Sequence, residues 1–354
     1  MKREENNVNT ETVQEYYSNV TGSAGGQMQT TVCHCGKEQY PLHMHDILRL
    51  IPDEIEQKAY GCGSPVPLAL EGCTVLDLGC GTGRDVYLTA RLVGPKGKVI
   101  GLDMNEEQLH VARKYQAQMT DAWGYSNVSF LRGNIEDLVS AGIADHSVDV
   151  VISNCVLNLA ADKERVFREI WRVLKFGGEL YFSDIFADRR VPEEIGRDPV
   201  LLSECMGGAM YVEDFRRMMR RCGWEDFRYV STCPVNIDNP EIEKKIGNIH
   251  YTSRTVRAMK LPGLLEDICE QYGQVVTYLG GITGAESAFD LDDHHHFEEG
   301  LPASVCGNTC AMLQHSRFSK HFLVQGDRSR HFGPFPGCGT ASSDGGCCEG
   351  GCCC

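Results

Sequence analysis

The stretch LDLGCGTGRD, residues 76–85, decides the fold class of this chain. A short apolar segment, 74–78, leads through Gly79, Gly81 and Gly83 into residues typical of a helix. Glycines at a strand-to-helix turn allow a tight bend, and they let a ligand approach the backbone N–H groups closely. The stretch therefore predicts a ligand-binding loop at the carboxyl end of a buried strand.

The same alternation of strand and helix patterns continues along the chain. Apolar runs predict further strands within 98–104, 127–138, 147–154 and 179–186. Strands that are separated by helices pair in parallel through right-handed crossovers. We therefore expect an α/β fold with a doubly wound, mostly parallel, Rossmann-like sheet and a smaller C-terminal α+β lobe.

Capping and breaking residues mark two of the expected helices. Asn105, with Gln108 three residues on, should begin a helix that continues through Met119. Asp162 should begin a second helix, and the pair 177–178, two glycines, should end it.

Composition restricts the class of partner. The 354 residues carry a formal net charge of −15, which argues against nucleic acid or an anionic membrane as the main partner. No window approaches the roughly 18 uninterrupted apolar residues of a spanning helix, and the charged N-terminus lacks the apolar core of a signal peptide. We therefore expect a cytoplasmic protein. In that compartment its 18 cysteines point to soft-ion binding or redox chemistry rather than to a disulfide scaffold.

The glycine turn departs from the dinucleotide fingerprint in an informative way. That fingerprint needs a glycine or alanine at its sixth position, where this chain has Arg84. Asp77 stands two residues before the first glycine, where its carboxylate can accept hydrogen bonds from a ligand's ammonium group. An amino-acid-bearing cofactor fits this turn better than a pyrophosphate.

The next two strand ends complete the expected cofactor. Asp103 ends the second strand, where a carboxylate takes the hydroxyls of a ribose. Residues 133–137, GNIED, end the third strand, where Glu136 or Asp137 can accept from the amino group of an adenine. Ammonium, ribose and adenine partners in this order predict S-adenosylmethionine.

The fourth strand end offers a soft nucleophile and no obvious base. Asn154 and Cys155 stand there, beside the expected methyl group. Oxygen and nitrogen acceptors usually need a general base, whereas a thiolate or the lone pair of a soft element does not. Cys205, Cys62 and Cys33 come from other segments that chain return could bring to the same sheet edge, which would make a soft trivalent site. The alternative for each cysteine alone is a buried or free thiol.

Several motifs resemble those of the arsenite methyltransferases, which are S-adenosylmethionine-dependent enzymes that methylate trivalent arsenic. The similar motifs are YGCG (60–63), LDLGCGTGRD (76–85), GLDM (101–104), SNCVLNL (153–159), RVLKFGGELYFSD (172–184) and ECMGGAMY (204–211), together with YGQVVTYLGGI, LDDHHHFEEG and VCGNTCAML in the C-terminal part. The resemblance covers roughly residues 10–335, and the SNC and ECxGGA motifs are specific to it.

The resemblance implies the roles of individual cysteines. Cys155 and Cys205 would hold As(III), with Cys62 as a further ligand, and Cys33 as the fourth matching cysteine. In that family the second pair takes part in binding or in disulfide-forming turnover. Cys35 is close enough to Cys33 to take its place.

The expected cofactor contacts come from the same motifs and strand ends. They are Tyr60, Asp77, Gly79, Gly81, Gly83, Arg84, Asp85, Asp103, Met104, Asn134, Ile135, Glu136 and Asn154.

The chemistry of arsenic agrees with these residues. As(III) prefers thiolates, which leave its lone pair free to attack the sulfonium methyl. Transfer oxidises arsenic formally to As(V), and a disulfide among the cysteines or an external thiol, glutathione or thioredoxin, would return it to As(III). We expect a monomeric enzyme that converts arsenite and methylarsenite to methylated and dimethylated arsenicals, and so detoxifies arsenic.

Four segments follow from these expectations. Residues 1–70 form an N-terminal segment and a lid over the site, 71–235 the methyltransferase domain, 236–337 the C-terminal lobe, and 338–354 a disordered tail with six cysteines. The resemblance does not reach the tail, to which we assign only the capture of arsenic or a metal.

Two rival functions remain open at this point. A methyltransferase acting on a small organic molecule, such as a quinone or sterol precursor, fits the glycine turn equally well but has no need for three cysteines. A soft-metal-binding thiol protein fits the tail but has no need for a cofactor site. A zinc site at 292–296 is disfavoured, because adjacent histidines point to opposite sides of an extended chain, and for Cys306 and Cys310 we favour packing.

Overall fold

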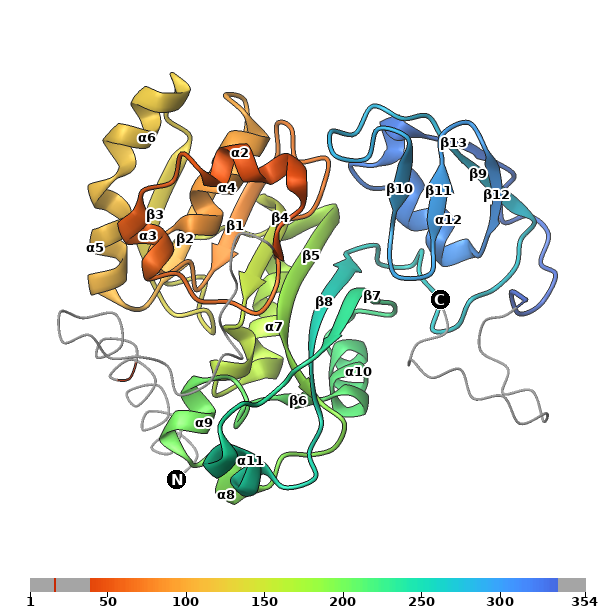
Figure 1. Cartoon of the computed structure of the whole chain (residues 1–354). Coiled ribbons are helices and arrows are strands. Elements are labelled where there is room, and N and C mark those ends of the chain that lie inside the picture. The colour runs from red at the N-terminus through yellow and green to blue at the C-terminus, as the bar shows by residue number, and fades with distance from the viewer. Residues whose placement is uncertain (1–15, 17–38, 337–354) are drawn as a thin grey trace.

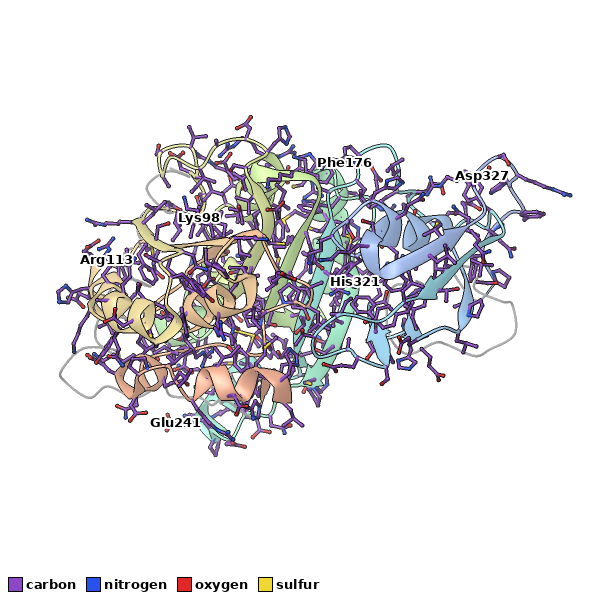
Figure 2. All side chains as sticks on the ribbon, turned by 90° about the horizontal axis from the view of Figure 1, so that it is seen from above. Lys98, Arg113, Phe176, Glu241, His321 and Asp327 are labelled. Atoms are coloured by element: carbon purple, nitrogen blue, oxygen red, sulfur yellow. A yellow bond between two sulfur atoms is a disulfide. The ribbon has the colours of Figure 1, made fainter. Side chains whose placement is uncertain are left out.

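The computed structural model describes Tyr16 and residues 39–336. A large sheet with helices on both faces stands beside a smaller C-terminal unit that is built on a three-stranded sheet (Figure 1). Viewed from above, Lys98 and Arg113 lie on the side of the molecule away from this unit, which carries His321 and Asp327 (Figure 2). None of the helices in the described residues has the length and apolar composition needed to cross a bilayer.

The large sheet has the strand order β3-β2-β1-β4-β5-β8-β7, with β6 paired to β5. Strands β1 to β6 pair in parallel, and β8 pairs antiparallel with both β5 and β7. The strands are β1 (Thr74–Leu78), β2 (Lys98–Asp103), β3 (Val128–Arg132), β4 (Val148–Asn154), β5 (Leu174–Ala187), β6 (Met210–Tyr211), β7 (Arg228–Pro234) and β8 (Tyr251–Met259). The predicted mostly parallel, doubly wound sheet is confirmed.

The helices of this part of the chain include α2 and α3, which precede β1, and those that follow it between the strands. They are α2 (His45–Leu48), α3 (Asp53–Gln57), α4 (Arg84–Val93), α5 (Glu106–Lys114), α6 (Gln116–Trp123), α7 (Lys163–Val173), α8 (Glu193–Gly196), α9 (Pro199–Ser203), α10 (Val212–Arg221) and α11 (Pro240–Ile246), with the 3-10 turns η2 (Leu42–Met44) and η3 (Leu157–Leu159).

Alternating side chains divide the core into two layers. In β1, Leu76 and Leu78 pack in a cluster with residues of α7 and α10, whereas Val75 packs in a cluster with residues of α2, α3, α4 and α5. This alternation follows from the period of two along a strand. Successive side chains of β1 therefore enter opposite layers of the core.

The sheet extends past the division that we expected at residue 235. Strand β8 lies beyond that point, yet it pairs along β5 from Glu179–Met259 to Ala187–Tyr251. The change in sequence pattern near residue 235 reflects the connection through α11 and the antiparallel direction of β7 and β8, rather than the end of the sheet.

Two expected helices end differently in the structure. Helix α7 ends at Val173, and β5 follows directly, so Gly177 lies inside the strand with φ +74°. A Cβ atom at this glycine would lie 2.2 Å from the carbonyl oxygen of His315, so the glycine permits close approach of the C-terminal unit. The helix expected over 105–119 is two helices, α5 and α6, separated at Tyr115, which has φ −97° and ψ 0°.

The C-terminal unit has its own apolar core, which includes Tyr278, Phe289, Phe318 and Phe322. Its elements are β9 (Gln274–Tyr278), β10 (Ala288–Asp290), β11 (His296–Glu298), β12 (Pro302–Val305), α12 (Gly307–Gln314), η4 (Ser319–His321) and β13 (Phe322–Gln325), with the order β12-β9-β13 and a separate β10-β11 pair.

A buried ionic cluster joins the C-terminal unit to the large sheet. Glu179 of β5 pairs with Arg257 of β8 and with Arg317, which follows α12. The guanidinium of Arg317 also donates to the carbonyl oxygen of Leu68 at 2.9 Å. These contacts connect the C-terminal unit to both the sheet and the segment that precedes β1.

Candidate active site

A cavity lies at the carboxyl ends of β1, β2, β3 and β4. Twelve of the thirteen predicted cofactor residues line it, together with one of the predicted cysteines: Tyr60, Asp77, Gly79, Gly81, Arg84, Asp85, Asp103, Met104, Asn134, Ile135, Glu136, Asn154 and Cys155. Parallel strands present their carboxyl ends at one edge of a sheet, which is where open α/β folds bind ligands.

Gly83 is the predicted cofactor residue that does not line this cavity. It precedes α4 with φ +89°, and a Cβ atom there would lie 3.1 Å from the ring of Phe130. Its role is to let the helix begin and pack closely against β3. Gly79 brings backbone to the cavity wall, with φ +73° and a Cβ position only 2.4 Å from Val156 Cγ2.

Three carboxyl groups, those of Asp77, Asp85 and Asp103, line the cavity together with the guanidinium of Arg84. Asp77 is buried, and its burial together with the charges of Asp85 and Asp103 raises its pKa well above the usual value. Burial also raises the pKa of Asp103, against the hydrogen bonds that it accepts from backbone N–H groups. A ligand that brings a positive charge would relieve this repulsion, so the wall suits a cation such as an ammonium.

The polar residues at the second and third strand ends are held in place by backbone contacts. Asp103 accepts from the N–H groups of Gly81 and Asn105, both at 2.8 Å. Glu136 lines the cavity and accepts from the N–H of Ala161 at 2.8 Å. Asp137, the alternative to Glu136, instead accepts from the hydroxyl of Ser140 at 2.7 Å.

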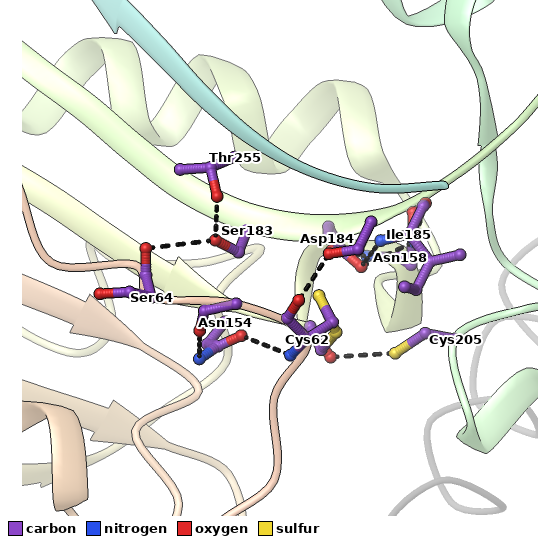
Figure 3. The surroundings of a disulfide bond; sticks show 12 residues. Cys62, Ser64, Asn154, Asn158, Ser183, Asp184, Ile185, Cys205 and Thr255 are labelled. Atoms are coloured by element: carbon purple, nitrogen blue, oxygen red, sulfur yellow. Dashed lines mark hydrogen bonds between the residues drawn. A yellow bond between two sulfur atoms is a disulfide. The ribbon is translucent and has the colours of Figure 1, made fainter. Parts of the chain in front are cut away.

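Asn154 fastens the segment that carries Cys62 to the end of β4 (Figure 3). Its Oδ1 accepts from the N–H of Cys62 at 3.0 Å, and its Nδ2 donates to the carbonyl oxygen of Gly63 at 2.9 Å. A Cβ atom at Gly61 would lie 2.4 Å from Asn154 Nδ2, so glycine is needed for the segment to dock this closely. The segment is therefore fixed against the sheet edge, and Asn154 serves both it and the cavity wall.

The structure brings three of the four predicted cysteines together. Cys62 and Cys155 form a disulfide between residues whose Cα atoms are 6.1 Å apart. The buried thiol of Cys205 donates to the carbonyl oxygen of Cys155 at 3.1 Å (Figure 3). Cys33, the fourth, and Cys35, its alternative, lie outside the described residues, as does the cysteine-rich tail.

Both Cys155 and Cys205 have a left-handed backbone conformation, which residues other than glycine rarely adopt. Their φ angles are +54° and +66°. Such a conformation costs of order 1–3 kcal/mol and persists where the surrounding structure imposes it, often at functional sites. The strain supports a site at these two residues rather than ordinary packing.

Sequence reasoning missed Asp184, because we expected no base near this strand end. One ligand atom each from Cys155, Asp184 and Cys205 lie within 4.8 Å of one another, and all three residues are buried. Burial raises the pKa of Asp184 to about 7, although N–H groups of Ile185 and Asn158 donate to it and Lys163 is close by. The signal was its place in the fifth strand, where "FSD" follows an apolar run, but a single aspartate there is unspecific.

The other candidate ion sites have internal partners. Asp292 accepts from the backbone N–H groups of His294 and His295 and contacts the His295 ring, whereas His296 contacts Asp290. In the part of the chain that the structure describes, one group of at least three side chains could share a single ion. It consists of Cys155, Asp184 and Cys205.

Comparison with known proteins covers both parts of the molecule. A family model described as a methyltransferase domain matches residues 69–223, and another described as the arsenite methyltransferase C-terminal domain matches residues 271–345. An arsenite methyltransferase of Aquipseudomonas alcaligenes is 48% identical over 329 residues, which are 93% of this chain and 94% of the relative. The arsenite methyltransferase of Homo sapiens is 40% identical over 317 residues, covering 88% of this chain and 83% of the relative.

One solved structure extends the similarity to three dimensions. The arsenic(III) S-adenosylmethionine methyltransferase of Chlamydomonas reinhardtii is similar with a TM-score of 0.81 at 46% identity, covering 84% of this chain and 99% of that chain. The similarity in three dimensions therefore extends over most of this chain and nearly all of that one.

Proposed function

The chain belongs to the arsenite methyltransferase family, and on that premise we propose that it transfers the methyl group of S-adenosylmethionine to trivalent arsenic held by its own thiolates. Its large domain is an S-adenosylmethionine-dependent methyltransferase domain of class I. One observation carries the assignment of the site. Cys155 lines the cofactor cavity, while its carbonyl oxygen contacts the thiol of Cys205 immediately behind that wall.

The cavity residues fit S-adenosylmethionine. Asp77, whose pKa is raised by burial and by neighbouring carboxylates, would hold the ammonium group of the methionine moiety. Asp103 would accept from the ribose hydroxyls with its remaining lone pairs, and Glu136 from the adenine amino group. The cofactor supplies a methyl group on a positively charged sulfur atom, and Gly79 leaves room for it beside Asn154 and Cys155.

The thiolates prepare arsenic for the transfer. Each As–S bond replaces an As–OH bond, and the hydroxide leaves as water with the thiol proton. Thiolate ligands retain the arsenic lone pair, which then forms the As–C bond while the methyl–sulfonium bond breaks. The burial of Cys155 and Cys205 excludes water from this step. Arsenic is formally oxidised from As(III) to As(V).

The Cys62–Cys155 pair would return arsenic to the trivalent state. Formation of this disulfide releases two electrons, which matches the reduction of As(V) to As(III). An external thiol reductant, glutathione or thioredoxin, would then regenerate the two thiols by exchange. In this cycle Cys205 keeps its thiol, and Cys33 or Cys35 serves as the further thiol.

Several broader features complete the proposal. We place residues 1–70 as an N-terminal segment and lid, 71–259 as the methyltransferase domain with β8 included, 260–337 as the C-terminal lobe and 338–354 as a thiol-rich tail. The enzyme acts as a monomer in the cytoplasm, on arsenite and methylarsenite, and its role is the detoxification of arsenic.

A label-transfer assay tests the proposal. The full chain is incubated with arsenite, a thiol reductant and S-adenosylmethionine labelled in its methyl group, and the arsenicals are separated by chromatography. We expect the label in methylated arsenicals, with none when arsenite is omitted. The proposal would be overturned if folded protein that binds S-adenosylmethionine left arsenite without label.

A further inference from the structure

A second pair of cysteines lies in the C-terminal unit, well separated in sequence from the candidate active site. Cys269 precedes β9, and Cys306 stands directly before α12; both are buried and carry thiols that are outside the Cys62–Cys155 disulfide. They form a small cluster of their own, against which the half-buried ring of Phe335 packs. From the sequence we favoured packing for Cys306 and Cys310, whereas in the structure Cys306 lies beside Cys269, 37 residues earlier.

Backbone contacts fix the two cysteines next to each other. The N–H of Gly307, beside Cys306, donates to the carbonyl oxygen of Glu270, beside Cys269, at 2.9 Å. The N–H of Phe335 donates to the carbonyl oxygen of Cys269 at 2.7 Å. The side chains of Cys269 and Cys306 pack in one small buried cluster. The pair is therefore held in position by three separate segments of chain.

Hydrogen-bond donors and positive charge converge on the sulfur of Cys306. It caps α12 and accepts from the N–H of Thr309 at 3.4 Å, with the Thr309 hydroxyl 3.3 Å away. The buried guanidinium of Arg228 donates to that hydroxyl at 3.4 Å, and His295 Nε2 lies 3.3 Å from it. The Cys269 thiol first, and then Arg228 and Thr309, lower the pKa of Cys306 below its usual value against the effect of burial.

This environment differs from that of a cysteine used only for packing. A buried cysteine in apolar surroundings is an inert thiol, whereas one near a cation and a helix N-terminus is a thiolate that binds soft ions. Burial of Cys222 raises the pKa of its thiol to about 11. Cys222 is therefore an example, in the same chain, of a cysteine that serves only for packing, and it can be used as a control.

We propose that Cys269 and Cys306 form a second dithiol site, which binds trivalent arsenic away from the methyl-transfer site. Two As–S bonds replace two As–OH bonds of arsenous acid, and the third hydroxide stays. The proton of Cys269 and one proton from solvent convert the two departing hydroxides to water, and arsenic remains As(III), so no oxidant or reductant is needed. The choice of arsenic as ligand rests on the proposed function, whereas the dithiol itself does not.

Arsenic binding in a chain without the first site tests this inference. Cys155→Ser and Cys205→Ser are combined in the full chain, which is reduced with a phosphine and dialysed against arsenite; bound arsenic per chain is measured by elemental mass spectrometry. Adding Cys269→Ser or Cys306→Ser should each lower the stoichiometry by one arsenic per chain. Adding Cys222→Ser should leave it unchanged. The tail cysteines contribute equally to every variant.

The measured stoichiometry of arsenic binding can be separated from effects of the substitutions on folding and on methyl transfer. Serine retains an oxygen at the helix cap in Cys306→Ser, and Cys269→Ser does not touch the cap, so one variant remains interpretable if the other unfolds. Methyl transfer plays no part in the readout, so failure of the proposed function and failure of this site are distinguishable. Unchanged stoichiometry in both variants, or a Cys269–Cys306 disulfide that persists in reductant and excludes arsenic, would overturn the inference.

Discussion

The thiol of Cys205 donates to the carbonyl oxygen of Cys155 at 3.1 Å, although the two residues are 50 positions apart. Both have positive φ, and only Cys155 reaches the cofactor cavity. An atom that both sulfurs hold would therefore lie directly behind the wall that faces the transferable methyl group. The contact between Cys155 and Cys205 therefore places a binding site for a thiophilic methyl acceptor next to the cofactor cavity of a general methyltransferase fold.

Removing either of these thiols should abolish methylation while cofactor binding survives. Serine has nearly the size of cysteine but is a poor ligand for soft arsenic. We expect Cys155→Ser and Cys205→Ser each to lower the rate of arsenic methylation by about 100-fold or more, as when reacting groups lose their positions. The rate is measured by label transfer and cofactor affinity by calorimetry.

Cys222→Ser is the matched control for both variants. Cys222 is also a buried free thiol, but it lies near the carbonyl oxygen of Glu164 on α7. Its replacement should leave the rate within about twofold of the parent chain. Full activity in Cys155→Ser or Cys205→Ser would mean that arsenic is bound elsewhere.

Gly61→Ala should detach the segment that carries Cys62. The added Cβ atom would lie 2.4 Å from Asn154 Nδ2, so the segment must move away from β4. Because a displacement of about 1 Å can cost roughly 100-fold in rate, we expect a loss of that order. Hydrogen exchange of residues 60–64 should rise in parallel.

Gly196→Ala is the matched control for this glycine. Its Cβ atom would meet Gly207 O at 3.4 Å, which is an ordinary contact. If Gly61→Ala kept both normal exchange and normal activity, docking of the Cys62 segment would not matter for turnover.

Asp103→Asn should weaken cofactor binding by about 10- to 100-fold, since a hydrogen bond to a charged group is worth about 1.5–3 kcal/mol. The amide retains only one of the two oxygens that the carboxylate offers to Gly81, Asn105 and the ligand. Isothermal calorimetry with S-adenosylmethionine measures the change. Exposed Asp121 on α6 gives the control, Asp121→Asn, and equal affinity in the two variants would argue against the ribose role.

Stability should depend on pH through Asp184. Its pKa is about 7 in the folded chain against 3.8 in the unfolded chain, so the folded state holds a proton that the unfolded state releases. The stabilising contribution is complete below the unfolded pKa and is lost as pH rises through 7. Between pH 5.5 and pH 8 the wild type should therefore lose about 2 kcal/mol relative to Asp184→Asn.

Denaturant unfolding of the reduced proteins at both pH values measures this difference. The comparison uses the change in the gap between wild type and Asp184→Asn, because the substitution itself also disturbs hydrogen bonds with Asn158. A gap that is the same at pH 5.5 and pH 8 would show that Asp184 does not titrate in this range.

The cofactor-binding residues could be predicted from the sequence because each one stands at the end of a strand that the local sequence pattern reveals. Asp77, Asp103 and Glu136 each follow a recognisable strand, and parallel pairing alone brings the three strand ends to one edge. The same reasoning chose Glu136 and Asp137 as alternatives. The structure separates them, because Glu136 lines the cavity whereas Asp137 accepts a hydrogen bond from Ser140.

The rest of the site depends on contacts between distant segments, which no local pattern encodes. Asp184 becomes significant only because α9 and the turn after it return Cys205 to the end of β4. The Cys269–Cys306 pair likewise depends on where β9 and α12 meet. The antiparallel strand β8 was missed for a similar reason, since the helix–strand alternation that marks a parallel sheet stops before it.

We predict that arsenic binds between Cys155 and Cys205, beside the cofactor cavity. Anomalous diffraction at the arsenic absorption edge, from crystals of the reduced full chain with arsenite, tests it most directly. The predicted result is an arsenic peak bonded to the Sγ atoms of both residues, which disappears in Cys155→Ser. Arsenic peaks only at other cysteines, with both of these thiols unoccupied, would contradict it.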